Sequence, residues 1–196
     1  MILWINGAFG SGKTTISYEL HRRLPNSFIY DPEKIGYFIR RNSPKQIVKD
    51  DFQDYEIWRT FNYSMLKTIH NDFSGIIIVP MTIVNPQYFY EIIEKLRDDE
   101  IEIKHFTLLA SHETLLKRLK RRGDGINSWP AQQIERCIRG LTQDLFKFHI
   151  NTDDLTIEEV VDQIAQEATI KLLPDNQSEI QKKIARLIIK IKHIRI

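Results

Sequence analysis

Short apolar runs alternate with longer amphipathic stretches along most of this 196-residue chain. Candidate strands fall at residues 2–5, 27–31, 75–81, 101–109 and 149–153; the first and third are the most apolar, and residues 101–109 alternate apolar and polar side chains. Runs of this length are typical of strands, and the stretches between them repeat apolar residues every three or four positions, as helices do. The alternation predicts an α/β fold in three layers, with a mostly parallel five-stranded sheet between helices.

A glycine-rich segment follows the first apolar run and precedes a helical pattern. Its sequence, GAFGSGKT at residues 7–14, fits the pattern G-x-x-x-x-G-K-S/T. Backbone N–H groups can surround a phosphate chain closely in such a loop because glycine carries no side chain. We therefore predict a nucleotide-phosphate site, the P-loop, formed by Gly7, Ala8, Phe9, Gly10, Ser11, Gly12, Lys13 and Thr14.

The chemistry of this loop predicts ATP and Mg2+ as cofactors. Lys13 would supply a positive charge to the phosphates, and Thr14, in the first turn of the following helix, a hydroxyl ligand for Mg2+. The third apolar run leads into Pro80, Met81 and Thr82, where motor and GTPase-type sites place an aspartate. This disfavours an energy-coupling ATPase and leaves room for a small-molecule phosphotransferase in which Thr82 hydrogen-bonds a ligand.

Asp31 stands where the second strand is expected to end. Ligands of open parallel sheets bind beyond the carboxyl ends of the strands, so Asp31 would face the same crevice as the P-loop. Its carboxylate could accept the proton of an attacking hydroxyl or hold a water of Mg2+. Alternatively, it caps the helix that begins near Pro32. Its position favours the catalytic role.

Residues 33–73, between the second and third strands, are mostly helical in pattern and rich in charged and aromatic side chains. An insert at this point would form a flap over the crevice. Its larger side chains either stack on a base or sugar or, as their helical spacing favours, face the core. They are Trp58, Phe61 and Met65. In the second case Arg59 and Asn62 lie off the buried stripe, and we predict that both contact the substrate.

A basic helix is predicted after Ser111, and it runs into a glycine-containing loop at residues 123–130. This composition is typical of a mobile lid that brings guanidinium groups onto a transferring phosphoryl group. A solvated basic helix face is the alternative. We favour the lid because phosphoryl transfer needs cations and no other cluster in the body supplies them. Arg118 and Arg122, four residues apart on one face, are predicted to act there, with Arg121 as an alternative.

The charge is unevenly distributed, although the whole chain carries only +2. From residue 179 onward there are six bases and one acid, which leaves 22 bases against 25 acids in the rest. A slightly acidic body with a basic tail argues against a nucleic-acid surface and favours a local electrostatic attachment. We expect a P-loop kinase-like domain over residues 1–170 and a linker with a C-terminal helix over residues 171–196.

The predicted C-terminal helix is amphipathic. Its apolar stripe consists of Ile180, Ile184, Leu187, Ile188, Ile191 and Ile194, and its opposite face of Lys182, Arg186, Lys190 and His193. Such a helix fits attachment to an anionic membrane surface. It fits docking on the protein's own body equally well.

Cys137 is the one cysteine, and its helical pattern favours a buried apolar role. The absence of an intramolecular disulfide suits a reducing cytosol. The chain enters its first strand at once, and no apolar run reaches the roughly 18 to 20 residues of a membrane-spanning helix. We therefore expect a cytoplasmic protein, either soluble or peripheral on the inner face of the cell membrane.

With these residues assembled, the chain resembles the ATP-binding tunicamycin-resistance protein family of bacteria, within the wider group of P-loop nucleoside and nucleotide kinases. The P-loop is shared with a vast superfamily, whereas the later motifs are far more specific. The resemblance spans the whole chain and is carried by WINGAFGSGKT (4–14), YDPEKIG (30–36), KDDFQ (49–53), WRTFNYS (58–64), IVPMTIVNPQYF (78–89), HFTLLAS (105–111), ETLLKRL (113–119), NSW (127–129) and the terminal HIRI.

The resemblance implies resistance to tunicamycin, a uridine-containing nucleoside antibiotic, by an ATP-binding protein associated with the membrane through its C-terminal helix. It leaves three mechanisms open. The protein could phosphorylate the drug, with Asp31 as the base and Lys13, Arg118 and Arg122 neutralising the phosphoryl group. It could bind the drug at the membrane without modifying it. It could also be a kinase for another nucleoside-like molecule.

Overall fold

The computed structural model describes residues 1–192. Five strands form one parallel sheet in the order β2-β3-β1-β4-β5, which confirms the predicted fold class. The strands are β1 (Ile2–Gly7), β2 (Ser27–Ile29), β3 (Ile76–Pro80), β4 (Ile103–Leu109) and β5 (His149–Asn151). Strand β1 runs further than its apolar residues alone predict, because Asn6 and Gly7 continue the pairing with Thr107 and Leu108.

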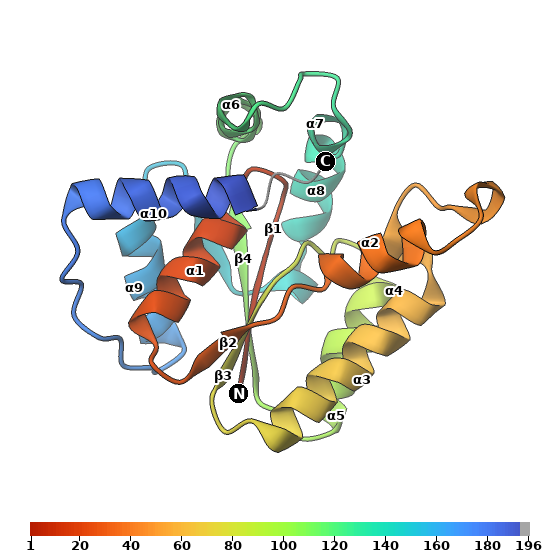
Figure 1. The fold of residues 1–196 in the computed structure, drawn as a ribbon, viewed down its shortest axis with the longest axis horizontal. Helices are drawn as coiled ribbons and strands as arrows, with labels where there is room; N and C mark the ends of the chain where they lie inside the picture. Colours follow the sequence, from red (N-terminus) through yellow and green to blue (C-terminus); the bar gives the residue numbers. More distant parts are fainter. Residues whose placement is uncertain (193–196) are drawn as a thin grey trace.

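Helices cover both faces of this sheet (Figure 1). They are α1 (Lys13–Arg23), α2 (Glu33–Arg41), α3 (Glu56–Asp72), α4 (Pro86–Phe89), α5 (Lys95–Asp98), α6 (His112–Arg122), α7 (Trp129–Gln132), α8 (Ile134–Leu141), α9 (Ile157–Glu167) and α10 (Glu179–Lys192). A π-helical turn, η3 (Tyr90–Glu94), joins α4 to α5 without a break. Short 3-10 turns are η1 (Lys45–Ile47), η2 (Phe52–Asp54) and η4 (Asp144–Phe146).

The alternation of side chains along β1 divides the core in two. Leu3 and Ile5 point to one face and pack with residues of α1 and α9. Ile2 and Trp4 point to the other face and pack with residues of α3, of the helix that runs from α4 to α5, and of α8. Because successive side chains of a strand point to opposite faces, a strand that is apolar throughout requires helices on both sides.

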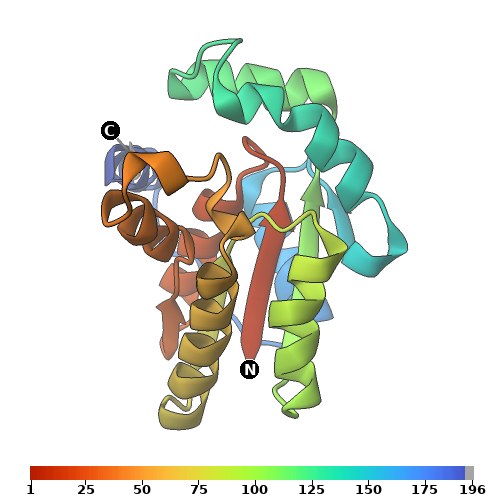
Figure 2. The ribbon, with the colours of Figure 1, turned by 90° about the vertical axis from the view of Figure 1, so that its right-hand side faces the viewer.

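The carboxyl ends of the strands carry the loops that concern function. Figure 2 shows α6 and the segment after it lying over this edge of the sheet, above the end of β1. The P-loop connects β1 to α1, and the loop at residues 81–85 connects β3 to α4. These are the positions at which open α/β sheets bind ligands.

The C-terminal helix α10 lies across α1 and α9 (Figure 1). It faces the body with polar side chains, and its apolar side points to solvent. Ile180, Ile184 and Leu187 are 71%, 54% and 57% exposed. The structure therefore gives a third arrangement, in which the helix docks on the body but leaves its apolar stripe open. His193 and Ile194 of the predicted faces, with the terminal HIRI motif, lie outside the described residues.

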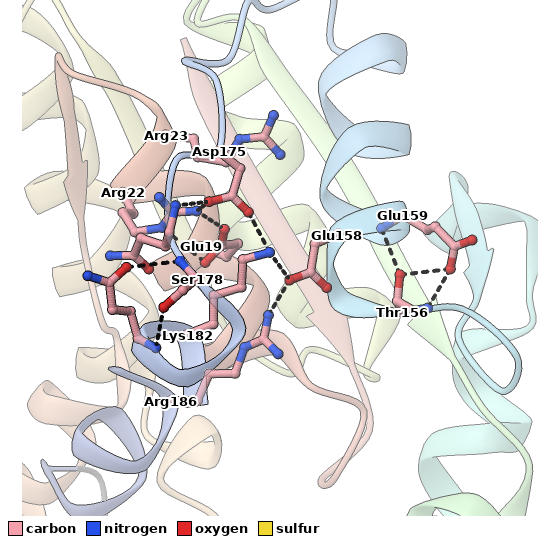
Figure 3. Close-up of polar contacts among 12 residues, drawn as sticks. Glu19, Arg22, Arg23, Thr156, Glu158, Glu159, Asp175, Ser178, Lys182 and Arg186 are labelled. Atoms are coloured by element: carbon pink, nitrogen blue, oxygen red, sulfur yellow. Dashed lines mark hydrogen bonds and ion pairs between the residues drawn. The ribbon is translucent and has the colours of Figure 1, made fainter. Parts of the chain in front are cut away.

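An ion-pair network holds α10 in place (Figure 3). Lys182 Nζ lies 2.7 Å from an Asp175 oxygen and 3.3 Å from a Glu158 oxygen. Arg186 donates to Glu158 at 2.6 Å, and Arg22 of α1 donates to Asp175 at 2.7 Å. The arginine and lysine partners hold the pKa of Asp175 down at about 2, with the Lys182 hydrogen bond as the largest cause.

None of the helices within residues 1–192 combines the length and the apolar character that crossing a membrane requires.

Candidate functional site

The P-loop leaves β1 and enters α1 through a backbone that only glycine adopts easily. Gly10 and Gly12 have φ angles of 85° and 100°, in the left-handed region. Gly12 is the N-cap of α1, so Lys13 and Thr14 stand in the first turn, at the positive end of the helix dipole. The Ser11 hydroxyl is buried and has no hydrogen-bond partner among the described residues. A phosphate oxygen would supply that partner, so the loop fits a nucleotide.

Lys13 spans this loop. Its Nζ donates to the Gly7 carbonyl at 2.9 Å and to the Ala8 carbonyl at 3.0 Å. Burial, with a smaller contribution from the positive charge of Arg122, lowers the pKa of Lys13 to about 8. An anionic ligand placed beside the ammonium group would oppose this shift, so the lysine is arranged to receive negative charge.

Asp31 follows β2 at the carboxyl edge of the sheet, as predicted. Its Oδ1 accepts a hydrogen bond from the Glu33 N–H at 3.1 Å, at the start of α2. This contact corresponds to the capping alternative. It does not conflict with a catalytic role, because a carboxylate can accept several hydrogen bonds. The role of Asp31 as a base remains a prediction.

Of the three side chains of the flap that were expected to face the core, Trp58 does so and the other two do not. Phe61 and Met65 are 42% and 39% exposed, whereas Arg59 and Asn62 are buried. The expectation that Arg59 and Asn62 lie off the buried stripe is therefore wrong. The inward side of α3 follows the spacing Trp58, Asn62 and Leu66, all three fully buried.

Polar partners from other elements allow this burial. Arg59 is paired with Glu91, donates to the Gln53 carbonyl at 2.6 Å and lies 4.4 Å from the centre of the Tyr88 ring. Asn62 accepts from the Tyr30 hydroxyl at 2.8 Å and donates to the Trp58 carbonyl at 2.7 Å. These contacts order the flap, and substrate binding by the two residues stays a prediction.

Thr82 is also buried, and its hydroxyl donates to the Gly7 carbonyl at 2.7 Å. The one hydrogen of this hydroxyl is thus directed to the P-loop, and only its lone pairs are left for a ligand. The predicted contact of Thr82 with a substrate is not tested by this arrangement. What the contact does establish is a direct link between the end of β3 and the phosphate-binding loop.

The two predicted lid arginines differ in their surroundings. Arg118 reaches the end of β5, where it donates to the Thr152 hydroxyl at 2.9 Å and to the Thr152 carbonyl at 2.6 Å. One of its nitrogens also lies 3.5 Å from the Ser11 carbonyl of the P-loop. Arg122, at the end of α6, pairs with Asp124 at 2.6 Å. Arg118 therefore joins the P-loop to β5, and Arg122 stands at the start of the lid loop.

Helices α7 and α8 also contact the P-loop. The ring of Trp129 meets that of Phe9 edge-on, with centres 5.1 Å apart. Cys137 of α8 is fully buried, as predicted, and burial raises the pKa of its thiol. The lid region is thus in contact with the P-loop through both α7 and α8.

Sequence reasoning missed two residues of this site, Asn6 and His105. Both are buried polar residues of strands, Asn6 at the end of β1 and His105 within β4. A polar residue within a buried strand is itself a signal, because its hydrogen-bonding groups need partners. Apart from Gly7, the partners of these two residues lie more than 40 residues away in the chain, so the sequence could mark the residues but could not predict their contacts.

Comparison with known proteins places this site in a family. A family model described as AAA domain matches residues 2–143. The solved structure of the tunicamycin resistance protein of Deinococcus radiodurans is 31% identical, with a TM-score of 0.74, over 88% of this chain and 98% of that one. The chain belongs to the tunicamycin resistance protein family. The predicted resemblance is confirmed, and membership of a P-loop family implies nucleotide binding.

More distant structures share the fold of this family member. A sugar kinase from Janibacter sp. is 18% identical, with a TM-score of 0.58, over 86% of this chain and 94% of that one. A gluconokinase from Sinorhizobium meliloti is 14% identical, with a TM-score of 0.61, over 94% of this chain and 95% of that one. No curated protein sequence matches. At these identities the two kinases show a common P-loop kinase-like fold and nothing about substrate.

Proposed function

We propose that this tunicamycin resistance protein homologue is an ATP-dependent phosphotransferase that phosphorylates a hydroxyl of tunicamycin. The observation that carries the proposal is the assembly of the P-loop, Arg118 and Asp31 at one edge of the sheet. Phosphoryl transfer requires little covalent chemistry from a protein and depends on positioning and on cations around the phosphates. Residues at this edge of the sheet would supply the positioning and the cations.

The roles of the residues follow from their places. The hydroxyl oxygen of the acceptor forms a bond to the γ-phosphorus of ATP, and the bond between that phosphorus and the bridging oxygen of ADP breaks. The Asp31 carboxylate takes the hydroxyl proton. Lys13 and Arg122 stabilise the charge that develops on the phosphoryl oxygens, while Arg118 fixes the P-loop against β5.

Thr14 would be the protein ligand of Mg2+, which neutralises charge on the ATP phosphates when bound. Its hydroxyl stands in the first turn of α1, immediately after the lysine of the loop. Magnesium usually keeps several waters and takes only one or two protein ligands beside the phosphates of a substrate. The Thr14 hydroxyl would therefore be sufficient as the protein ligand of Mg2+.

The test is to incubate the protein with ATP, Mg2+ and tunicamycin and to measure the mass of the drug. We expect tunicamycin to gain one phosphoryl group. Asp31→Asn should bind ATP as the wild type does and lose transfer, whereas Asp72→Asn, a matched change at an exposed aspartate of α3, should retain both. Tight binding of tunicamycin with unchanged mass would instead establish sequestration, the alternative function. Transfer to another nucleoside, but not to tunicamycin, would establish a different kinase.

The family resemblance also leads us to propose that α10 attaches the protein to the inner face of the cell membrane. Lys182 and Arg186 are engaged with Glu158, so the docked helix offers its apolar side rather than these charges. Deletion from Glu179 onward should abolish sedimentation with lipid vesicles and spare ATP binding. Binding that requires anionic lipid and is lost on neutral vesicles would contradict attachment through the apolar side.

A further inference from the structure

The carboxamide of Asn6 lies at the carboxyl end of β1, directly before the P-loop. Its Oδ1 accepts from the Gly7 N–H at 2.8 Å and from the Ile83 N–H at 3.0 Å. Its Nδ2 donates to the Ile83 carbonyl at 2.9 Å and to His105 Nε2, which is 3.2 Å away. All the usual hydrogen bonds of a carboxamide are made, inside the protein and at full burial.

This side chain continues the sheet where the backbones of β1 and β3 no longer pair. The last direct bond between them runs from the Met81 N–H to the Ile5 carbonyl at 3.1 Å. Beyond it, the Asn6 carboxamide offers Ile83 one acceptor and one donor, as a neighbouring strand would. The bond from the Thr82 hydroxyl to the Gly7 carbonyl, 2.7 Å long, runs in parallel. Three hydrogen bonds thus join the start of the P-loop to residues 82–83.

His105 fixes the orientation of the Asn6 carboxamide. Its Nδ1 lies 2.9 Å from the Lys147 carbonyl, which can only accept, so Nδ1 carries the hydrogen. Burial lowers the pKa of His105 to about 4, so the ring is neutral at pH 7 and its Nε2 is an acceptor. Only the Nδ2 side of Asn6 can face such an atom. The ring of Phe89, 5.1 Å away and perpendicular, holds the imidazole in place.

The link extends from Ile83 to the base of the lid. The next residue, Val84, packs directly on Gly140 of α8, where a Cβ would come within 2.2 Å of Val84 Cγ1. Helix α8 contacts the P-loop again near Phe9, through Cys137. A shift of residues 82–85 relative to the P-loop would therefore be transmitted to the helix that follows the lid, because packed interiors transmit displacement.

We propose that Asn6 and His105 are positioning residues that hold the P-loop and residues 82–85 in one fixed arrangement. A nucleotide bound by the P-loop then presents its γ-phosphoryl group to an acceptor held against residues 82–85. The inference rests on the proposed phosphotransferase function. Since misplacement by about 1 Å can cost about 100-fold in rate, such a link governs transfer more strongly than nucleotide affinity.

Three variants and one control test the proposal. Asn6→Asp keeps the shape of the side chain and the two hydrogen bonds accepted by Oδ1, but it replaces the Nδ2 donor by an oxygen that faces the Ile83 carbonyl and His105 Nε2. His105→Phe keeps an aromatic ring beside Phe89 and removes the hydrogen-bond acceptor for Asn6. His105→Gln restores an acceptor. Thr107→Val is the control, because Thr107 stands opposite Asn6 in the sheet but its buried hydroxyl donates to the Phe146 carbonyl and not to Asn6, Ile83 or His105.

We expect Asn6→Asp and His105→Phe to lower kcat by about 100-fold and to change ATP affinity by less than about 10-fold. His105→Gln should recover most of kcat. Equal kcat values in Asn6→Asp, His105→Phe and Thr107→Val would overturn the proposal. Nitrogen NMR should find His105 neutral at pH 6 in the wild type and protonated in Asn6→Asp, where a buried carboxylate favours the imidazolium.

Hydrogen exchange on ATP binding tests this link without requiring phosphoryl transfer, so it is independent of the proposed function. Adding ATP should slow hydrogen exchange at the Ile83 amide of the wild type together with the P-loop amides. In Asn6→Leu, which has neither the acceptor nor the donor that Ile83 uses, ATP should protect the P-loop alone. If the wild type transfers no phosphoryl group, the proposed function fails and the exchange result still decides the link. Protection of Ile83 that survives in Asn6→Leu would contradict the link.

Discussion

Replacing Lys182 with methionine should release α10 while the rest of the protein stays folded. The lysine side chain is only 10% exposed and lies between the carboxylates of Asp175 and Glu158, at 2.7 and 3.3 Å. Methionine keeps the apolar stem and removes the charge. Both carboxylates keep an arginine partner, Arg22 or Arg186, so neither is left unpaired.

The expected magnitude follows from these contacts. Hydrogen bonds to charged groups contribute about 1.5–3 kcal/mol, and the remaining arginine partners favour the lower part of that range. A loss of about 2 kcal/mol raises the released fraction of α10 by about 30-fold. Because an isolated helix of this length is marginal in water, the released segment should exchange its amide hydrogens freely.

Hydrogen exchange resolved by mass spectrometry measures this directly. Peptides within residues 179–192 should lose about 30-fold in protection, while peptides of α1 and α9 do not change. Lys171→Met is the matched control, since Lys171 is exposed and forms no ion pair with any residue whose side chain the structure describes. Ile184→Ser should also leave protection intact, because that side chain faces solvent. If Ile184→Ser loosens α10 and Lys182→Met does not, the apolar side of α10 and not the ion pairs of Lys182 holds the helix on the body.

Three further predictions concern the site and the core. Lys13→Ala should weaken ATP binding by about 10- to 100-fold in calorimetry, as expected for a charge-assisted contact, and an unchanged affinity would exclude Lys13 from the phosphate site. Because the pKa of His105 is lowered to about 4 from an ordinary 6.5, only the unfolded chain takes up this proton between those pH values. The free energy of unfolding should therefore fall by about 2 kcal/mol more from pH 6.5 to pH 5 in the wild type than in His105→Gln, as urea titrations can establish. Gly140→Ala should destabilise the fold by about 1–3 kcal/mol in the same titrations, because its Cβ would overlap Val84, and a neutral result would show that the loop can move aside.

The sequence predicted those features that local residues decide. The P-loop pattern, the apolar strands and the helix after Ser111 depend on neighbouring positions, and all three form where they were expected. Asp31 reaches the carboxyl edge because a strand and a proline-led helix meet there. Periodicity alone predicted a three-layer α/β fold, and the family motifs narrowed it to a P-loop kinase-like fold.

Distant partners explain what the sequence could not predict. Arg59 is buried in α3 because Glu91, from a later helix, pairs with it. The apolar side of α10 faces solvent because its lysine and arginine find acids in α9 and in the linker. In both cases hydrophobic periodicity assigns the wrong side, since it treats every charge as exposed. Distant partners also explain Asn6, a polar residue that can be buried in β1 because Ile83 and His105 complete its hydrogen bonds.

We propose that this member of the tunicamycin resistance protein family transfers a phosphoryl group from ATP to tunicamycin. The most direct measurement is the mass of tunicamycin after incubation with ATP, Mg2+ and the wild-type protein, with Lys13→Ala as the inactive control. We predict the addition of one phosphoryl group by the wild type, matched by one ADP for each drug molecule modified. Tunicamycin that is bound tightly by the ATP complex and recovered with its original mass would contradict the claim.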